Sequence, residues 1–319
     1  MEIRREPMNI NEFFDSLPIY VESALRDHGI TDVEVERTMV TKSNDTLLHG
    51  LLLKKKGLDI CPTYYMEDFY ELFGEIGGLE LAAREMVRSY IITGNPRFPD
   101  LTKELDKLLD KLGFRLLDAE RNREFLEEVP YRRMCGDLVM IADVRLGPDE
   151  EWRTILTKEL LERYDFTEDQ IFDKALENAA KYEPPVLTVI EEELNGGAVD
   201  LMNERREDFP KDKVYVLSNA GRRLGAGAIF YPGVAEMVAH MIGRYTIIPS
   251  SIHEVILIPD SLDIPYEAMQ TMLREANDFY VDKKEVLSDR LMRVDEAGAI
   301  SPVDVEDYIA EKVSEEAWQ

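Results

Sequence analysis

Two serines, a histidine and a carboxylate form the most suggestive chemical cluster in the sequence. They are Ser250, Ser251, His253 and Glu254, and a strongly apolar segment follows them. A hydroxyl beside an imidazole base and a carboxylate is the combination that enzymes use for nucleophilic catalysis. We therefore take these four residues as the candidate catalytic residues of a hydrolase.

The spacing of these residues also supports a simpler interpretation. Members of a catalytic triad come from distant positions in the chain, whereas Ser251 and His253 lie two residues apart on one predicted strand. The GxSxG motif of many hydrolases is missing, and His253-Glu254 lacks the second histidine of the helical zinc motif. The alternative is the start of a strand, where the serines satisfy backbone groups and His253 holds a turn.

A glycine-rich segment at 221–227, GRRLGAG, carries two arginines. A phosphate-binding loop follows a strand and opens a helix, so that backbone N–H groups face the anion. Here the apolar residues Ala226–Phe230 predict a second strand instead of a helix. The pattern therefore favours a flexible hairpin connection, and we expect no cofactor.

Cysteine and histidine are too sparse for an obvious metal centre. The chain has 2 cysteines and 4 histidines, without a CxxC or HxxxH pair among them, and a zinc site needs about four ligands at short spacing. We expect no metal. Cys61 and Cys135 each lie beside apolar residues and are interpreted as small core side chains.

Charge is the strongest compositional signal. The 65 acidic and 38 basic residues give a net charge of 38 − 65 = −27. Direct binding to nucleic acid needs a basic face, so we do not expect a nucleic-acid partner. An ordinary solvated surface explains this much acid, and an acidic mimic of nucleic acid is the alternative hypothesis.

The sequence points to the cytoplasm. Its first residues, MEIRREPMNINEFF, lack the apolar stretch of a signal peptide. No run approaches the roughly 18 apolar residues of a membrane helix, and two cysteines are few for a secreted protein. We expect a cytoplasmic protein that does not enter a membrane.

The first part of the chain, residues 1–97, predicts a small α+β unit. Apolar residues recur at helical spacing between Asn11 and His28 and predict the first helix, with Asn11 as its cap. Lys42-Ser43-Asn44-Asp45 is a turn signal and predicts a hairpin. The predicted strands are Val33–Thr41, Thr46–Leu53 and Leu58–Tyr65, and the helices that follow them are Glu67–Phe73 and Leu79–Thr93.

Residues 98–130 are highly charged and predict a helical connector to a larger unit at 131–303, which an acidic tail follows at 304–319. The Val-Ile-Leu-Ile run at 255–258 lacks polar alternation, which is typical of a strand covered on both faces. We therefore predict a mixed α+β fold (mixed α/β) whose second unit has a central sheet flanked by helices.

The elements of this second unit follow from apolar runs and helical periodicity. Thr167, with Gln170 three residues on, forms a capping box that starts a helix. The predicted strands are Gly136–Val144, Val214–Leu217, Ala226–Phe230, Tyr245–Ile248, Glu254–Ile258 and Arg290–Val294. The predicted helices are Trp152–Tyr164, Glu168–Lys181, 186–206, Val234–Ile242 and Pro265–Phe279, the last with Met269, Met272, Leu273 and Ala276 facing inward.

Several long runs resemble one family. They are ICPTYYMEDFYELFG at 60–74, RTILTKELLERYDFTEDQIFDKALENAAK at 153–181, AGAIFYPGVAEMVAHMIG and YTIIPSSIHEVILIPDS at 226–261, and EANDFYVDKKEVLSDRLMRVD at 275–295. They are similar to the bacterial domain-of-unknown-function family 5688, and the resemblance covers about residues 15–296. It implies an uncharacterised bacterial, intracellular protein and transfers no mechanism.

Three functions agree with the sequence. The leading hypothesis is an acidic intracellular protein that acts by binding another protein, because no motif has the spacing of a known chemistry. The alternatives are a hydrolase with a site at the C-terminal sheet and an acidic nucleic-acid mimic. The pattern leaves the oligomeric state open.

Overall fold

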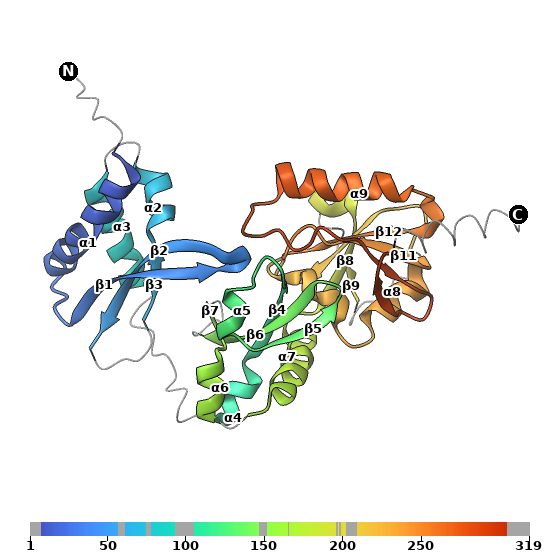
Figure 1. Cartoon of the computed structure of the whole chain (residues 1–319), viewed down its shortest axis with the longest axis horizontal. Helices are drawn as coiled ribbons and strands as arrows, with labels where there is room; N and C mark the ends of the chain where they lie inside the picture. Colours follow the sequence, from blue (N-terminus) through green and yellow to red (C-terminus); the bar gives the residue numbers. More distant parts are fainter. Residues whose placement is uncertain are drawn as a thin grey trace, which may run out of the picture. The chain divides into compact units, whose positions relative to one another are not determined.

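The computed structural model divides the chain into two compact units (Figure 1). The first comprises Met1–Lys42 and Thr46–Phe98, and the second comprises Ser43–Asp45 and Pro99–Gln319. Both contain helices and antiparallel sheets, so the predicted mixed α+β class is confirmed. The structure describes residues 8–56, 61–74, 78–92, 105–146, 152–164, 166–195, 197, 199–201 and 209–304.

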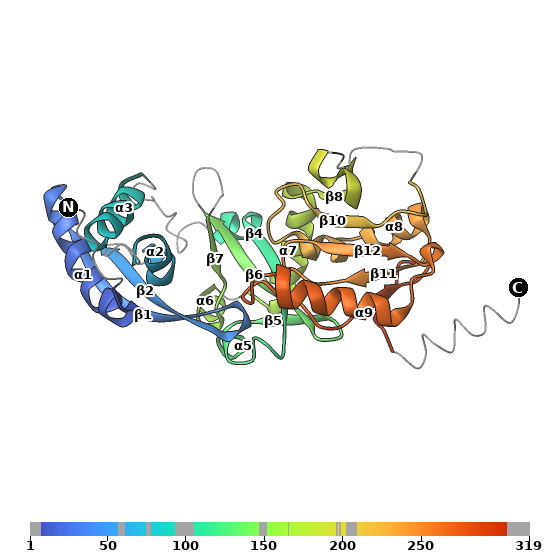
Figure 2. The same cartoon turned by 90° about the horizontal axis from the view of Figure 1, so that it is seen from above.

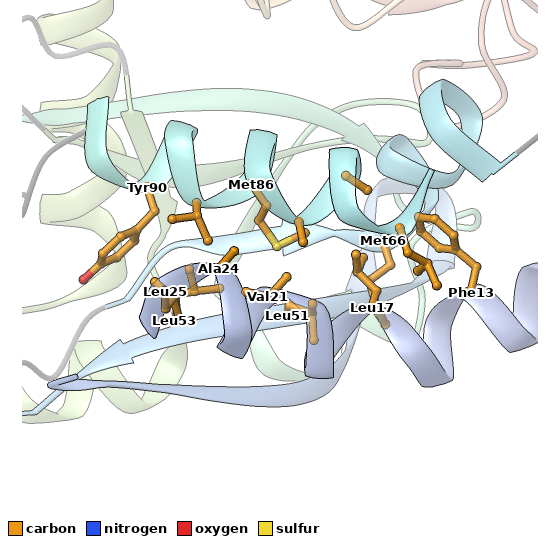
Figure 3. Close-up of a cluster of buried hydrophobic side chains, with 14 of the residues drawn as sticks. Phe13, Leu17, Val21, Ala24, Leu25, Leu51, Leu53, Met66, Met86 and Tyr90 are labelled. Carbon is orange, nitrogen blue, oxygen red and sulfur yellow. The ribbon is translucent and has the colours of Figure 1, made fainter. Parts of the chain in front are cut away.

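The first unit packs helices against an antiparallel sheet with the strand order β1-β2-β3. The strands are β1 (Val33–Lys42), β2 (Thr46–Lys55) and β3 (Thr63–Tyr65), and the helices are α1 (Ile10–Asp27), α2 (Met66–Phe73) and α3 (Leu79–Ile92). Figure 3 shows apolar side chains of α1 and α3 meeting across the core, with Leu51 and Leu53 of β2 among them. The predicted hairpin and helices of this unit are therefore confirmed.

Helix α1 starts earlier than the sequence suggests. The cap is Asn9, whose side-chain oxygen accepts a 2.9 Å hydrogen bond from the N–H of Asn11. The prediction of Asn11 as the cap was wrong. Both asparagines are good capping residues, but the helix begins at Ile10, so Asn11 already lies in its first turn.

A four-stranded sheet opens the second unit. Its strands are β4 (Leu112–Asp118), β5 (Tyr131–Cys135), β6 (Leu138–Leu146) and β7 (Trp152–Ile155), with β6 paired to the other three. The helices here are α4 (Leu105–Asp110), α5 (Phe125–Glu128), α6 (Lys158–Tyr164) and α7 (Glu168–Tyr182), and α7 packs on β4 and β6. The capping box of Thr167 and Gln170 is confirmed at the start of α7.

Two segments of this sheet were expected to be helical. Leu112–Asp118, inside the predicted helical connector, forms β4, and Trp152–Ile155 forms β7. Strand β4 is almost entirely buried, since it pairs with β6 and α7 packs on it. Its leucines therefore lack the alternation that would distinguish a strand from a helix.

A seven-stranded antiparallel sheet follows, in the order β14-β13-β11-β12-β10-β8-β9. Helices α8 (Val234–Ile242) and α9 (Tyr266–Glu275) cover its two faces (Figure 2). Ile248 packs with Met269 and Leu273 of α9, whereas Tyr245, on the other face, donates a 3.2 Å hydrogen bond to Ala235 O of α8. The strands are β8 (Pro185–Val189), β9 (Val199–Asp200), β10 (Tyr215–Asn219), β11 (Tyr245–Ile248), β12 (Val255–Pro259), β13 (Met292–Val294) and β14 (Ile300–Pro302).

Two further predictions in this sheet were wrong. The start of the helix predicted at 186–206 is instead strand β8 and a 3₁₀ helix, Ile190–Asn195. Ala226–Phe230, predicted as a strand, lies in a 3₁₀ helix, η4 (Gly225–Phe230), because its small residues pack closely on β10. Parts of other predictions lie outside the described residues, namely 58–60, 93–104, 202–206 and the tail beyond Asp304.

Within the described ranges, no helix combines the length and the apolar character needed to cross a membrane.

Candidate functional site

A tight loop joins β10 to η4 beside the predicted cluster. Arg222 and Leu224 have φ angles of 52° and 55°, the left-handed region that costs a non-glycine residue about 1–2 kcal/mol. Asn219 holds the loop from one side. Its Nδ2 donates to Arg223 O at 2.9 Å, and its Oδ1 accepts from the Arg223 N–H at 3.2 Å. Strain of this kind persists only where neighbouring groups fix it.

His253 holds the same loop from the other side. Its Nδ1 accepts a 3.1 Å hydrogen bond from the Leu224 N–H. Nδ1 therefore carries no proton, and we assign the ring proton to Nε2. Nε2 lies 3.5 Å from Glu285 Oε1. Both ring nitrogens thus face protein groups.

The structure brings Ser251 and His253 together through the backbone. Ser251 Oγ accepts a 3.0 Å hydrogen bond from the His253 N–H, and Ser250 and Ser251 are both buried at 6% exposure. Among the described residues, no serine hydroxyl is hydrogen-bonded to the imidazole. Glu254 is half-buried. This geometry favours the turn-holding interpretation, and a catalytic role for these four residues stays a prediction.

Sequence reasoning missed Ser218 in this corner and noted Gly225 only as part of the glycine-rich segment 221–227. Ser218 Oγ donates a 2.8 Å hydrogen bond to His253 O. A Cβ atom on Gly225 would lie 2.3 Å from Ser218 Oγ and 2.5 Å from Asn219 N. Glycine is therefore required where η4 starts, and the glycine-rich pattern was the available signal for it.

A buried ion network lies under this corner. Asp143, which is fully buried, accepts hydrogen bonds from Arg115 Nη2 at 2.8 Å and from Arg153 Nη1 at 2.9 Å. Arg153 also pairs with Glu183, whose Oε2 lies 3.5 Å from Asn219 Nδ2. Burial raises the pKa of Glu183, and the charge of Arg153 opposes this shift. These contacts link β4, β6 and β7 to the loop.

Two adjacent aromatic side chains, Phe279 and Tyr280, project from the end of α9. They are 77% and 84% exposed and lie on a π-helical turn, η6 (Ala276–Tyr280), that continues α9. Met272, predicted to face inward, is 46% exposed and lies two helical turns before Phe279. We call Phe279 and Tyr280 the aromatic patch.

The backbone around the aromatic patch is firmly anchored. Asn277 Nδ2 donates 2.9 Å hydrogen bonds to Ser288 O and to Asp289 Oδ1. The Asp282 carbonyl accepts from the Glu285 N–H at 2.7 Å, so a turn fixes the chain just after the patch. The two rings therefore stand on a fixed frame.

The other buried and ionisable groups show no metal centre. Among the residues that the structure describes, no group of three or more histidine, cysteine or acidic side chains is arranged to hold a metal ion. Cys135 is buried and Cys61 is half-buried, and both are free thiols.

Comparison with known proteins decides the family. The model of one family matches residues 10–293, which is most of the chain. The chain belongs to the family of unknown function DUF5688. The family assignment agrees with the resemblance of the long sequence runs and brings no assigned activity with it. No curated protein and no solved structure matches the chain.

Proposed function

We propose that the protein acts by binding another protein through the aromatic patch. The exposure of Phe279 and Tyr280 carries this proposal. Fully burying a side chain of this size stabilises a folded protein by about 1.5–3 kcal/mol. The two exposed aromatics do not contribute this stabilisation to the folded chain. Aromatic anchors that fill a partner's pocket are typical of binding hot spots.

The fixed frame of the patch supports the same proposal. Asn277 and the turn at Asp282 hold the backbone on both sides of the two aromatics. A pre-ordered anchor loses little conformational entropy when it binds, so more of its burial appears as affinity.

The partner that fits is a protein with an apolar pocket and a basic rim. Residues 274–285 contain four acids and three bases, a local charge of 3 − 4 = −1, in a chain of net charge −27. Opposite charges around a hydrophobic anchor speed encounter and exclude wrong partners.

The proposed setting is the bacterial cytoplasm. Cys61 and Cys135 are free thiols, which suits a reducing compartment. The sequence runs that resemble a bacterial family support the bacterial origin. Fractionation of cells that produce the tagged chain should recover it with cytoplasmic markers, and recovery with periplasmic or membrane markers would contradict this setting.

The test of binding compares three versions of the full chain as bait in affinity capture with quantitative mass spectrometry. They are the wild type, the double variant Phe279→Ser with Tyr280→Ser, and the control Ile190→Ser, whose side chain is 42% exposed outside the patch. One protein should be retained by the wild type and the control and lost from the double variant.

The captured protein is then purified and its Kd is measured directly. The double variant should bind at least about 30-fold more weakly, because each hot-spot aromatic contributes on the order of 2 kcal/mol. Higher salt should also weaken wild-type binding, as expected for a basic rim. An unchanged Kd, or a dimer of the wild type that the double substitution dissolves, would contradict a separate protein partner.

A further inference from the structure

The second unit also contains a pocket suited to a small ligand, and this pocket does not involve the aromatic patch. A pocket of about 320 Å³ lies between the segment after β4, strand β5 and the segment before β13. This volume is within the range of small-molecule sites. Three of its lining residues are arginines from these three places: Arg123, Arg133 and Arg290.

The pocket is locally cationic in an acidic chain. Its lining contains two carboxylates, Glu120 and Asp137, so its formal charge is 3 − 2 = +1, against −27 for the whole protein. Arg123 Nη2 pairs with Glu120 Oε2 at 2.7 Å. The Arg133 side chain is exposed and makes no ion pair or hydrogen bond with the part of the chain that the structure describes.

Asp137 pairs only loosely with Arg290. Its side chain is only 11% exposed, and Arg290 Nε lies 3.8 Å from its Oδ2, beyond a good hydrogen bond. Burial, followed by the charge of Asp118, raises the pKa of Asp137, although Ser288 Oγ donates to it at 3.1 Å. The Arg290 side chain is 68% exposed and only loosely paired with this carboxylate, so its guanidinium donors are available to another anion.

We propose that this pocket, the arginine pocket, binds a small phosphorylated molecule. Guanidinium groups present planar pairs of donors that match phosphate oxygens, and several of them are needed to balance a dianion. Tyr131 and Leu126 also line the pocket and offer apolar surface to the organic part of the ligand.

Titration calorimetry with phenyl phosphate, inorganic phosphate and benzoate tests this proposal on the full chain. Phenyl phosphate should bind more tightly than either of the other two, since it alone combines a phosphate with an apolar ring. Arg133→Ala should weaken it about tenfold, the equivalent of losing one charged hydrogen-bonding pair. The control Arg274→Ala, an exposed arginine of α9, should leave binding unchanged.

Three results would overturn the proposal: no saturable binding of phenyl phosphate, equal binding by wild type and Arg133→Ala, or benzoate binding as tight as phenyl phosphate. Because Arg133 is exposed and unpaired, its substitution should not impair folding, which circular dichroism checks.

A second variant tests the pocket by strengthening it. Asp137→Asn removes a negative charge and keeps an oxygen that accepts from Ser288. It should bind phenyl phosphate several-fold more tightly, and weaker binding would contradict the role given to Asp137. The double variant of the aromatic patch should bind phenyl phosphate as the wild type does, which separates this proposal from the one above.

Discussion

His253 Nδ1 accepts a 3.1 Å hydrogen bond from the backbone N–H of Leu224, a residue with a φ of 55°. The imidazole thus fixes a loop whose left-handed backbone is unfavourable by itself. Nδ1 is engaged and Nε2 faces Glu285. The ring therefore stabilises the backbone conformation where β10, η4 and β12 meet.

His253→Ala should therefore destabilise the second unit by about 1–2 kcal/mol, the cost of leaving a backbone N–H without its acceptor. His253→Asn should cost less, since its Oδ1 can take the place of Nδ1. Urea unfolding of both variants measures the difference, and hydrogen exchange at Leu224 should accelerate only in the alanine variant. Equal stability of the wild type and His253→Ala would be inconsistent with this role.

The buried network should be sensitive to the loss of one partner. Asp143→Ala leaves Arg115 and Arg153 without their shared carboxylate, and breaking a buried pair in this way costs about 3–5 kcal/mol. The matched control is Asp169→Ala, because Asp169 also pairs with an arginine, Arg132, but its side chain is 90% exposed. Surface pairs contribute about 0–1 kcal/mol. Thermal unfolding that shows similar losses for both variants would argue against a structural network.

Gly225→Ala should destabilise the protein because the added Cβ meets Ser218 Oγ at 2.3 Å and the backbone of Asn219 at 2.5 Å. Overpacking of this kind costs about 1–3 kcal/mol. Gly221→Ala, in the same loop, places its Cβ at an ordinary 3.6 Å from Asn219 Oδ1 and should be nearly neutral. If the two variants unfold at the same denaturant concentration, the close packing of η4 on β10 does not explain why glycine is needed at position 225.

Cys135 gives a pH dependence with a definite sign. Burial, followed by the charge of Asp137, raises the pKa of its thiol from 9.0 to about 11. The unfolded chain therefore ionises first, so stability present below pH 9 is lost as the pH rises toward 11. The loss is at most about 2–3 kcal/mol. Urea unfolding at pH 8 and pH 10.5 should show a steeper loss in the wild type than in Cys135→Ala, and parallel losses would refute the shift.

Local signals in the sequence predict much of the fold. The turn at Lys42–Asp45 fixes the hairpin, and the capping box of Thr167 fixes the start of α7, because each depends on neighbouring residues alone. Strands β4 and β8 were missed because they are buried on both faces and lack regular polar alternation. Such runs carry no period that separates strand from helix.

The site depends on contacts that the sequence does not encode locally. Asp143 meets Arg115 across 28 positions, and Leu224 meets His253 across 29. The serine-histidine cluster was visible as a pattern, but which atoms face the imidazole is decided by the strand pairing. Phe279 was the last residue of a predicted helix, and nothing in the sequence indicated that it and Tyr280 would be exposed on a π-helical turn after α9.

Site-specific photo-crosslinking in cells would detect a contact between the aromatic patch and another protein. A photoreactive phenylalanine analogue replaces Tyr280 in one version of the chain and Ile190 in a control version. We expect irradiation to give one discrete heavier adduct, containing a second protein, at position 280 and none at position 190. No adduct at position 280, an adduct of the chain with itself, or the same adduct at both positions would contradict the proposed contact.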